Sequence, residues 1–344
     1  MAVIAGDGVG QEVMPPAITC VDAALARHGH TIEWTHLDWG SDLYLRTGSM
    51  MPRDGLDLLS SHQAIFLGAV GMPGVPDTET LWGLLIPIRR AFEQYVNLRP
   101  VRSLPGITSP VAGGDALDLV IVRENNEGEY SEIGGRAYRD RAQEMAIQVD
   151  VFTRAGITKV AEFAAGYAAH RRGLVTSATK SNGIIHSMPF WDEVTAQVCA
   201  ANGVELESVL IDALVAKLVL QPSHFDVIVA SNLFGDILSD LAGAIAGSIG
   251  VAPSANLNPE RTYPSLFEPV HGSAPDIAGQ GIANPIGQVW SGAMMLDHLG
   301  QHEAAADLVA AFEAVLARGI VTRDLGGTAS TDEVGDAIVA ELTA

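Results

Sequence analysis

Two aspartates that lie four residues apart, Asp236 and Asp240, are the leading candidates for chemistry in this sequence. They follow the apolar segment Phe225–Ala230, after which Gly235 allows a turn from strand to helix. On a helix their spacing places both carboxylates on one face, where they repel each other unless a cation lies between them. Oxygen ligands without a nearby thiol or imidazole favour Mg²⁺ or Mn²⁺. Asp212 is a third candidate ligand, although an aspartate at a helix start can also act only as a cap.

Three arginines, Arg89, Arg99 and Arg123, are candidates for binding an anionic substrate. The chain has 20 Lys and Arg against 41 Asp and Glu, so clustered arginines are informative. Arg123 follows the strand-like segment Leu117–Val122, and open α/β sheets bind ligands at the carboxyl ends of their strands. A guanidinium binds a carboxylate through two parallel hydrogen bonds, so three of them suit a dicarboxylic acid. The alternative for each arginine is an ion pair with a nearby acid.

Tyr130 and Lys180 are candidates for moving protons. A lysine acts as a base at neutral pH only where a metal or another cation lowers its pKa. Without such a neighbour, Lys180 would be a loop lysine and Tyr130 a packing residue.

A long loop rich in glycine and small residues, Phe267–Pro285, is the candidate for binding a cofactor. Its backbone N–H groups can approach phosphates and a flat adenine closely, although a plain surface loop is the alternative. The segment Gly6–Gly10 resembles a dinucleotide fingerprint but has Gln11 where the third glycine should be. It therefore does not predict a Rossmann site.

Short apolar segments alternate with helical patterns along the chain, which predicts an α/β fold with a largely parallel sheet. The expected strands are Ala2–Ala5, Ala64–Val70, Asp118–Arg123, Leu174–Ala178 and Val227–Ala230. The expected helices are Glu12–His28, Thr80–Tyr95, Val160–Arg171 and Met188–Ala201, with a C-terminal helix begun by a capping box at Ser330 and Glu333.

Two proline-rich passages, Pro100–Pro110 and Pro253–Pro269, are expected to cross between two lobes. Residues 1–95 and 247–344 then form a discontinuous cofactor-binding lobe. Residues 96–246 form an inserted lobe for metal and substrate binding, with a protruding arm near 131–150.

The composition excludes several functional classes. A formal net charge of −21 makes contact with nucleic acid or anionic lipid unfavourable. No apolar run reaches the ~20 residues needed to cross a bilayer. Cys20 and Cys199 match no metal or redox spacing and are expected to be buried thiols, so we expect a cytoplasmic protein.

Four motifs resemble those of the β-decarboxylating dehydrogenases, the family of isopropylmalate and isocitrate dehydrogenases. They are Asn97–Pro100, Arg123–Tyr130, Asn232–Asp240 and His271–Asp276. The resemblance covers essentially the whole chain and is greatest to the tartrate and D-malate branch, on stretches such as Thr80–Gly83 and Ala252–Arg261.

The resemblance implies a role for each candidate residue. Arg89, Arg99 and Arg123, with Asp212, would bind substrate, and Asp212, Asp236 and Asp240 would hold Mg²⁺ or Mn²⁺. Lys180 would be the general base and Tyr130 the general acid. The cofactor NAD would be bound by Asn182, Glu268, His271, Gly272, Ser273, Ala274, Asp276, Ile277 and Asn284, where Asp276 disfavours a 2′-phosphate. K⁺ is a further candidate cofactor.

The resemblance also implies the family's open twisted sheet in two lobes, which is not a Rossmann fold. It further implies a homodimer in which the lobe of residues 96–246 serves dimerisation and Lys180 and Asp212 reach the partner's site. The implied reaction is NAD-dependent oxidative decarboxylation of D-malate, tartrate or both. Isopropylmalate dehydrogenation is the alternative, and bulky Trp82 is expected to fill the space of an isopropyl group. A non-catalytic regulatory subunit is the third hypothesis, which the complete set of candidate residues disfavours.

Overall fold

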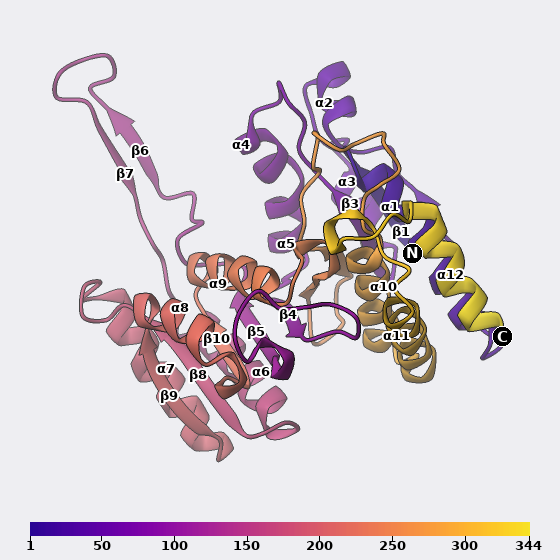
Figure 1. Cartoon of the computed structure of the whole chain (residues 1–344). Coiled ribbons are helices and arrows are strands. Elements are labelled where there is room, and N and C mark those ends of the chain that lie inside the picture. Colours follow the sequence, from indigo (N-terminus) through magenta and orange to yellow (C-terminus); the bar gives the residue numbers. More distant parts are fainter.

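The computed structural model describes residues 1–344, which form a ten-stranded central sheet covered by helices (Figure 1). The order of strands across this sheet is β2-β1-β3-β12-β11-β4-β5-β10-β8-β9. In that order they are Thr35–His36, Ala2–Gly6, Ala64–Ala69, Ser265–Pro269, Pro253–Leu257, Val96–Arg102, Asp118–Glu124, Val227–Ala230, Leu174–Thr179 and Glu205–Leu210. The expected α/β class is confirmed.

The sheet is parallel at both ends and antiparallel in the middle. Strands β2, β1, β3 and β12 run parallel to one another, as do β5, β10, β8 and β9. The pairs β12–β11, β11–β4 and β4–β5 are antiparallel. The passage Pro253–Pro269 is therefore not a simple connection, since it supplies two central strands. Its prolines are tolerated because Pro253 begins β11 and Pro269 ends β12, where the two residues face each other.

The two halves of the sheet come from different parts of the sequence. The half from β2 to β11 is built by residues that precede 96 or follow 246, and the half from β4 to β9 by residues between them. This arrangement supports the proposed boundary between two lobes along the β11–β4 pair.

Twelve α-helices surround the sheet (Figure 1). From α1 to α12 they are Gly10–Ala26, Ser41–Thr47, Gly55–Ser60, Asp77–Thr80, Ile86–Ala91, Arg154–Ala169, Ser187–Asn202, Ile211–Leu220, Asn232–Ile245, Ile286–His298, His302–Ala317 and Thr331–Thr343. Helices α1, α10, α11 and α12 pack against one another, and α6 packs against α7. None of the helices is long and apolar enough to cross a membrane.

Helix boundaries differ from the expected ones most clearly before β4. The helix expected over Thr80–Tyr95 is α4, a π-helical turn at Leu81–Leu85 and α5, which ends at Ala91. It stops early because Glu93 has a φ of 44° and β4 begins at Val96. The expected capping box of α12 is confirmed, since the Ser330 hydroxyl accepts from the Glu333 N–H and the Glu333 carboxylate from the Ser330 N–H.

The arm expected near residues 131–150 is an antiparallel hairpin of β6 (Gly134–Ala137) and β7 (Met145–Gln148). It extends away from the body of the molecule (Figure 1). Large apolar side chains on it, including those of Ile133 and Ile147, are exposed.

Candidate active site

Four of the predicted site residues lie at the carboxyl ends of neighbouring parallel strands or directly after them. Arg123 is the penultimate residue of β5, and Asp236 lies on α9, which follows β10. Lys180 follows β8 directly, and Asp212 is the second residue of α8, which follows β9. Open α/β sheets bind ligands at this edge because the loops there diverge and leave space.

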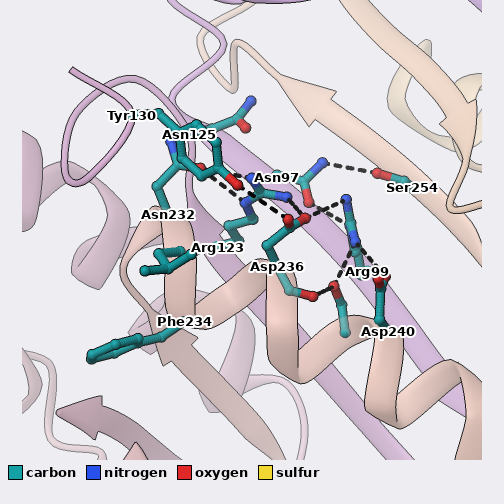
Figure 2. A network of polar contacts seen from close by, with 12 residues as sticks. Asn97, Arg99, Arg123, Asn125, Tyr130, Asn232, Phe234, Asp236, Asp240 and Ser254 are labelled. Carbon is teal, nitrogen blue, oxygen red and sulfur yellow. Dashed lines mark hydrogen bonds and ion pairs between the residues drawn. The ribbon is translucent and has the colours of Figure 1, made fainter. Parts of the chain in front are cut away.

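Two buried arginines face the aspartate pair on α9 (Figure 2). The Arg123 guanidinium forms an ion pair with Asp236 and donates through Nη2 to Asn232 Oδ1 at 2.7 Å. Arg99 lies 3.7 Å from a carboxylate oxygen of both Asp236 and Asp240. Burial lowers the pKa of Arg123 to about 10, so the guanidinium stays charged at neutral pH. The helical spacing has thus placed two carboxylates beside two fixed cations.

Gly235 allows α9 to approach β5 closely enough for these contacts. A Cβ atom at this position would lie 2.6 Å from both Cβ and Cγ of Arg123, which is closer than real side chains pack. The start of α9 is fixed by Ser231, whose hydroxyl accepts from the Phe234 N–H at 3.4 Å.

The Tyr130 phenol lies beside the same carboxylate. Its hydroxyl donates to Asp236 Oδ2 at 3.3 Å, and the Arg123 guanidinium is 5.7 Å from the centre of its ring. Burial and the negative charge of Asp236 raise the pKa of Tyr130, so the phenol keeps its proton at neutral pH. It can therefore serve as a proton donor.

A chain of buried amides connects the arginines to the other side of the cavity. Arg99 Nε donates to Asn97 Oδ1 at 2.8 Å (Figure 2). Asn97 Nδ2 donates to Asn256 Oδ1 at 3.0 Å. Asn256 donates in turn to Glu268 Oε1 at 2.7 Å. Arg89 Nη2 reaches the same carboxylate oxygen at 3.0 Å. Glu268, predicted to bind cofactor, is thus an ion-pair partner of a predicted substrate arginine.

A cavity of about 210 Å³ is lined by Arg89, Arg99, Arg123, Tyr130, Asp236 and Glu268, among others. Polar and charged groups dominate its lining, with an apolar wall of Leu81, Leu85 and Ile86 at one side. Trp82 does not line the cavity, because its ring lies against the Arg90 guanidinium at 5.1 Å. That Trp82 fills the space of an isopropyl group therefore stays a prediction. The helix turns Leu81 and Leu85 inward instead.

Lys180 and Asp212 form a second, separate group. Lys180 Nζ donates to Asp212 Oδ1 at 2.7 Å, and this hydrogen bond lowers the pKa of Asp212. Asn182 lies exposed in the turn after Lys180. None of these three residues lines the cavity.

The fit of a metal ion depends on how many carboxylates one chain supplies. Asp236 and Asp240 offer neighbouring oxygens with side chains 38% and 63% exposed, and such hard donors suit Mg²⁺ or Mn²⁺. Burial and the negative charge of Asp236 raise the pKa of Asp240, while the positive charge of Arg99 acts against them. A cation bound between the two aspartates would relieve the repulsion between their carboxylates. However, no three His, Cys, Asp or Glu side chains of this chain are placed to hold a metal. The pair fits a divalent cation as part of a larger ligand set.

The loop predicted to bind cofactor connects β12 to α10 and borders a second cavity of about 440 Å³. His271 lines both cavities, while Gly272 lines only the first. Burial lowers the pKa of His271, whose Nε2 atom has no protein partner. Of the other residues predicted to bind the cofactor, Ala274, Ile277 and Asn284 line the second cavity. Ser273 is buried and does not line it, and Asp276 is exposed.

Sequence reasoning missed the residues that support this loop. Val9 donates its N–H to Ser273 O at 2.9 Å, and a Cβ on Gly8 would lie 2.1 Å from that oxygen. Glu12 accepts from the Gly281 N–H at 2.7 Å. The glycine-rich start of the chain thus braces the cofactor loop. The sequence analysis compared the glycine spacing of this segment only with a Rossmann fingerprint, and that comparison does not indicate a role in supporting the cofactor loop.

Comparisons with known proteins agree with this geometry. The family model described as isocitrate/isopropylmalate dehydrogenase matches residues 1–338. A probable tartrate dehydrogenase/decarboxylase from Bacillus subtilis (strain 168) is 54% identical, with 99% of this chain and 97% of that protein covered. A D-malate dehydrogenase (decarboxylating) from Escherichia coli (strain K12) is 52% identical, with 98% and 97% covered.

Among solved structures, an isocitrate dehydrogenase from Methylococcus capsulatus superposes with a TM-score of 0.91 at 33% identity. The match covers 100% of this chain and 99% of that one. This likeness confirms the open-sheet fold expected from the motifs.

Proposed function

The chain belongs to the isocitrate/isopropylmalate dehydrogenase family, as its motifs predict, and we propose that it oxidises and decarboxylates D-malate, tartrate or both, with NAD as hydride acceptor. The observation that carries this proposal is the convergence of Arg99, Arg123, Asp236 and Tyr130 on one cavity that Arg89 also lines. The names of relatives more than 50% identical point to the same substrates.

Three arginines bind the two substrate carboxylates. Arg89, Arg99 and Arg123 are all buried and line the cavity from different strands and helices. Guanidinium groups held in fixed positions select a planar carboxylate at each end of a short substrate. They also orient the hydroxyl-bearing carbon toward the cofactor loop.

Two acidic residues of one subunit hold the divalent cation. Asp236 and Asp240 contribute their carboxylates to Mg²⁺ or Mn²⁺, and Asp212 of a second copy of the chain completes the set. When bound, the cation polarises the substrate hydroxyl and the carbonyl formed from it, and NAD accepts the hydride. K⁺ is a further candidate ion.

Lys180 and Tyr130 move the protons. Lys180 Nζ takes the proton from the substrate hydroxyl, and the Tyr130 hydroxyl later gives one to the carbon that loses carbon dioxide. The raised pKa of Tyr130, caused by burial and by Asp236, suits a donor at neutral pH. Since Lys180 lies outside the cavity of its own chain, it acts in the cavity of the partner in a homodimer.

The loop after β12 would hold NAD. His271, Ala274, Ile277 and Asn284 line the second cavity, and backbone N–H groups near Gly272 and Ser273 would bind the phosphates. Asp276 would repel a 2′-phosphate, and Glu268 and Asn182 are the remaining candidates for binding the cofactor. The two cysteines are free and buried, which supports a cytoplasmic location.

3-Isopropylmalate is a second candidate substrate because of the apolar wall of the cavity. Leu81, Leu85 and Ile86 would bury an alkyl group on the carbon next to the hydroxyl-bearing one. The same wall does nothing for the second hydroxyl of tartrate. Comparing these substrates therefore decides between the two candidates.

The test is NAD reduction by D-malate, L-malate, L-tartrate, meso-tartrate, 3-isopropylmalate and isocitrate, each with Mn²⁺ and with a chelator. We expect turnover of D-malate or a tartrate, loss of that turnover in the chelator, and weaker activity with NADP. Preferred turnover of 3-isopropylmalate would replace D-malate and tartrate as the proposed substrates. Full activity in the chelator would refute the role of the cation.

A further inference from the structure

The segment that carries Tyr130 is fastened on one side to the first turn of α9. The neighbouring residue Glu129 accepts through Oε1 from the Ser231 hydroxyl at 2.7 Å and through Oε2 from the Leu233 N–H at 3.0 Å. Both donors lie at the N-terminus of α9, where unpaired N–H groups and the helix dipole favour a carboxylate. Asp236 lies on the same helix, so Glu129 ties Tyr130 to the element that bears its hydrogen-bond partner.

The same segment is fastened on its other side by Arg90 of α5. Arg90 Nη2 donates to the backbone oxygen of Tyr130 at 3.0 Å, and Nη1 pairs with Glu132 Oε2 at 2.7 Å. The guanidinium also lies 5.1 Å from the centre of the Trp82 ring, which fixes its plane. One side chain thus contacts residues on both sides of Ser131.

Tyr130 has few contacts of its own to fix its position. The 3.3 Å distance from its hydroxyl to Asp236 is long for a hydrogen bond to a carboxylate, which is ordinarily about 2.5–2.7 Å. The chain that follows enters the exposed arm, whose strands β6 and β7 form a two-stranded sheet separate from the central sheet. The backbone on either side of the phenol therefore determines where it lies.

We propose that Glu129 and Arg90 are positioning residues that hold the Tyr130 phenol in reach of the substrate carbon. This rests on the proposed function, in which Tyr130 protonates the enolate left by loss of carbon dioxide. In that step the O–H bond of Tyr130 breaks, and the electron pair of the enolate forms the new C–H bond. Misplacing the donor by about 1 Å slows such a step about 100-fold without changing how the carboxylates bind.

The experiment measures proton transfer apart from substrate binding. Exchange of the methyl protons of pyruvate with D₂O, followed by NMR with NADH and Mn²⁺ present, reports the transfer between Tyr130 and carbon, and Tyr130→Phe gives its lower limit. Kinetics with the preferred dicarboxylate give kcat and KM. The test variants are Glu129→Ala and Arg90→Met. Glu129→Gln, which keeps the shape and one acceptor oxygen for the Leu233 N–H, should rescue the first in part.

Two variants serve as matched controls. Glu127, on the same segment, accepts from the N–H and hydroxyl of Thr153 at 2.8 and 2.7 Å and so caps α6 instead of α9. Arg154 pairs with Glu193 at 2.8 Å and lies 5.0 Å from the centre of the Phe190 ring, as Arg90 does with Glu132 and Trp82. Glu127→Ala removes a carboxylate that caps a helix, as Glu129→Ala does, but at α6. Arg154→Met removes an ion pair stacked on an aromatic ring, as Arg90→Met does, but without a contact to Tyr130.

We expect Glu129→Ala and Arg90→Met to lower both exchange and kcat about 10- to 100-fold, with KM changed less than about twofold, while both controls stay within about twofold of the parent. A raised KM with unchanged exchange in Arg90→Met would make Arg90 a direct substrate ligand and overturn its positioning role. Equal losses in Glu127→Ala would show that only general order of the segment matters. A parent inactive on every dicarboxylate would overturn the proposed function and this role with it.

Discussion

At the scale of single residues, Asp236 is the point where the charges of the site meet. It pairs with Arg123, lies 3.7 Å from Arg99 and accepts from the Tyr130 hydroxyl. Asp240, one helical turn away, has only the 3.7 Å contact with Arg99. The two aspartates are equivalent as oxygen donors to a metal ion, but only Asp236 is a close ion-pair and hydrogen-bond partner of buried side chains.

We therefore expect Asp236→Asn and Asp240→Asn to weaken Mn²⁺ binding to a similar extent, while only the first lowers stability. Arg123 is 4% exposed, and Asp236→Asn leaves its guanidinium without the carboxylate of Asp236 as ion-pair partner. The loss should be about 1–3 kcal/mol, below that of a fully buried pair because the Asp236 side chain is 38% exposed. Urea unfolding and Mn²⁺ titration by electron paramagnetic resonance measure the two effects. Equal stability of the two variants would contradict the assigned Arg123 contact.

Glu124, buried beside Arg123, gives a prediction about pH. Burial and the charges of Glu127 and Glu129 raise its pKa from 4.5 to about 7, although it accepts from the backbone N–H groups of Asn126 and Glu127. The folded chain then holds this proton more tightly than the unfolded chain. The resulting stabilisation is complete below pH 4.5 and is lost as the pH rises through about 7.

Glu124→Gln should remove this dependence, because Oε1 of the amide can still accept both backbone N–H groups. Between about pH 4.5 and 7 the unfolding free energy of the parent should fall relative to that of the variant, by on the order of 2 kcal/mol. Chemical denaturation at a series of pH values measures the difference. A difference that is constant across this range would show that Glu124 titrates near its ordinary value.

At the scale of elements, local patterns predicted five strands of the central sheet and several helices, but not how they join. The predicted strands β1, β3, β5, β8 and β10 follow from apolar runs, whereas the two-residue strand β2 has no such run, and the capping box marks α12. The roles of β11 and β12 did not follow, because pairing of Asn256 with Asn97 joins residues far apart in the chain. Arg90 and Glu129 were missed for a similar reason. Their partners are a backbone oxygen and a helix N-terminus that only the folded chain brings near.

The contact between α9 and β5 can be tested with two glycines. Gly235→Ala puts a methyl group 2.6 Å from Arg123, so α9 must move away and carry Asp236 with it. We expect a loss of about 1–3 kcal/mol and a clear fall in activity. Gly166, within α6, has no atom within 4 Å of its added Cβ, so Gly166→Ala should stabilise the protein by up to about 1 kcal/mol. Thermal unfolding of the pair measures both, and a tolerated Gly235→Ala would contradict the close packing.

At the scale of the whole molecule, the proposed site is divided between two groups of residues that one chain does not bring together. Tyr130, Asp236 and the arginines line the cavity, whereas Lys180 and Asp212 pair with each other outside it. The arm, which extends away from the body of the molecule, exposes Ile133 and Ile147 (Figure 1). A second copy of the chain, related by twofold symmetry, would cover such side chains and place its own lysine in the first copy's cavity.

This arrangement predicts that two inactive variants restore each other. Co-expressed Lys180→Ala and Tyr130→Phe chains form heterodimers in which one site has both mutations and the other has neither. Random association makes about half of the dimers mixed, each with one intact site of two, so activity should recover to about a quarter of the parent's. Lys180→Ala with Asp212→Asn is the matched control, since both changes affect the same group and every site stays damaged. Recovery in neither mixture, with dimers present, would place the complete site within a single chain.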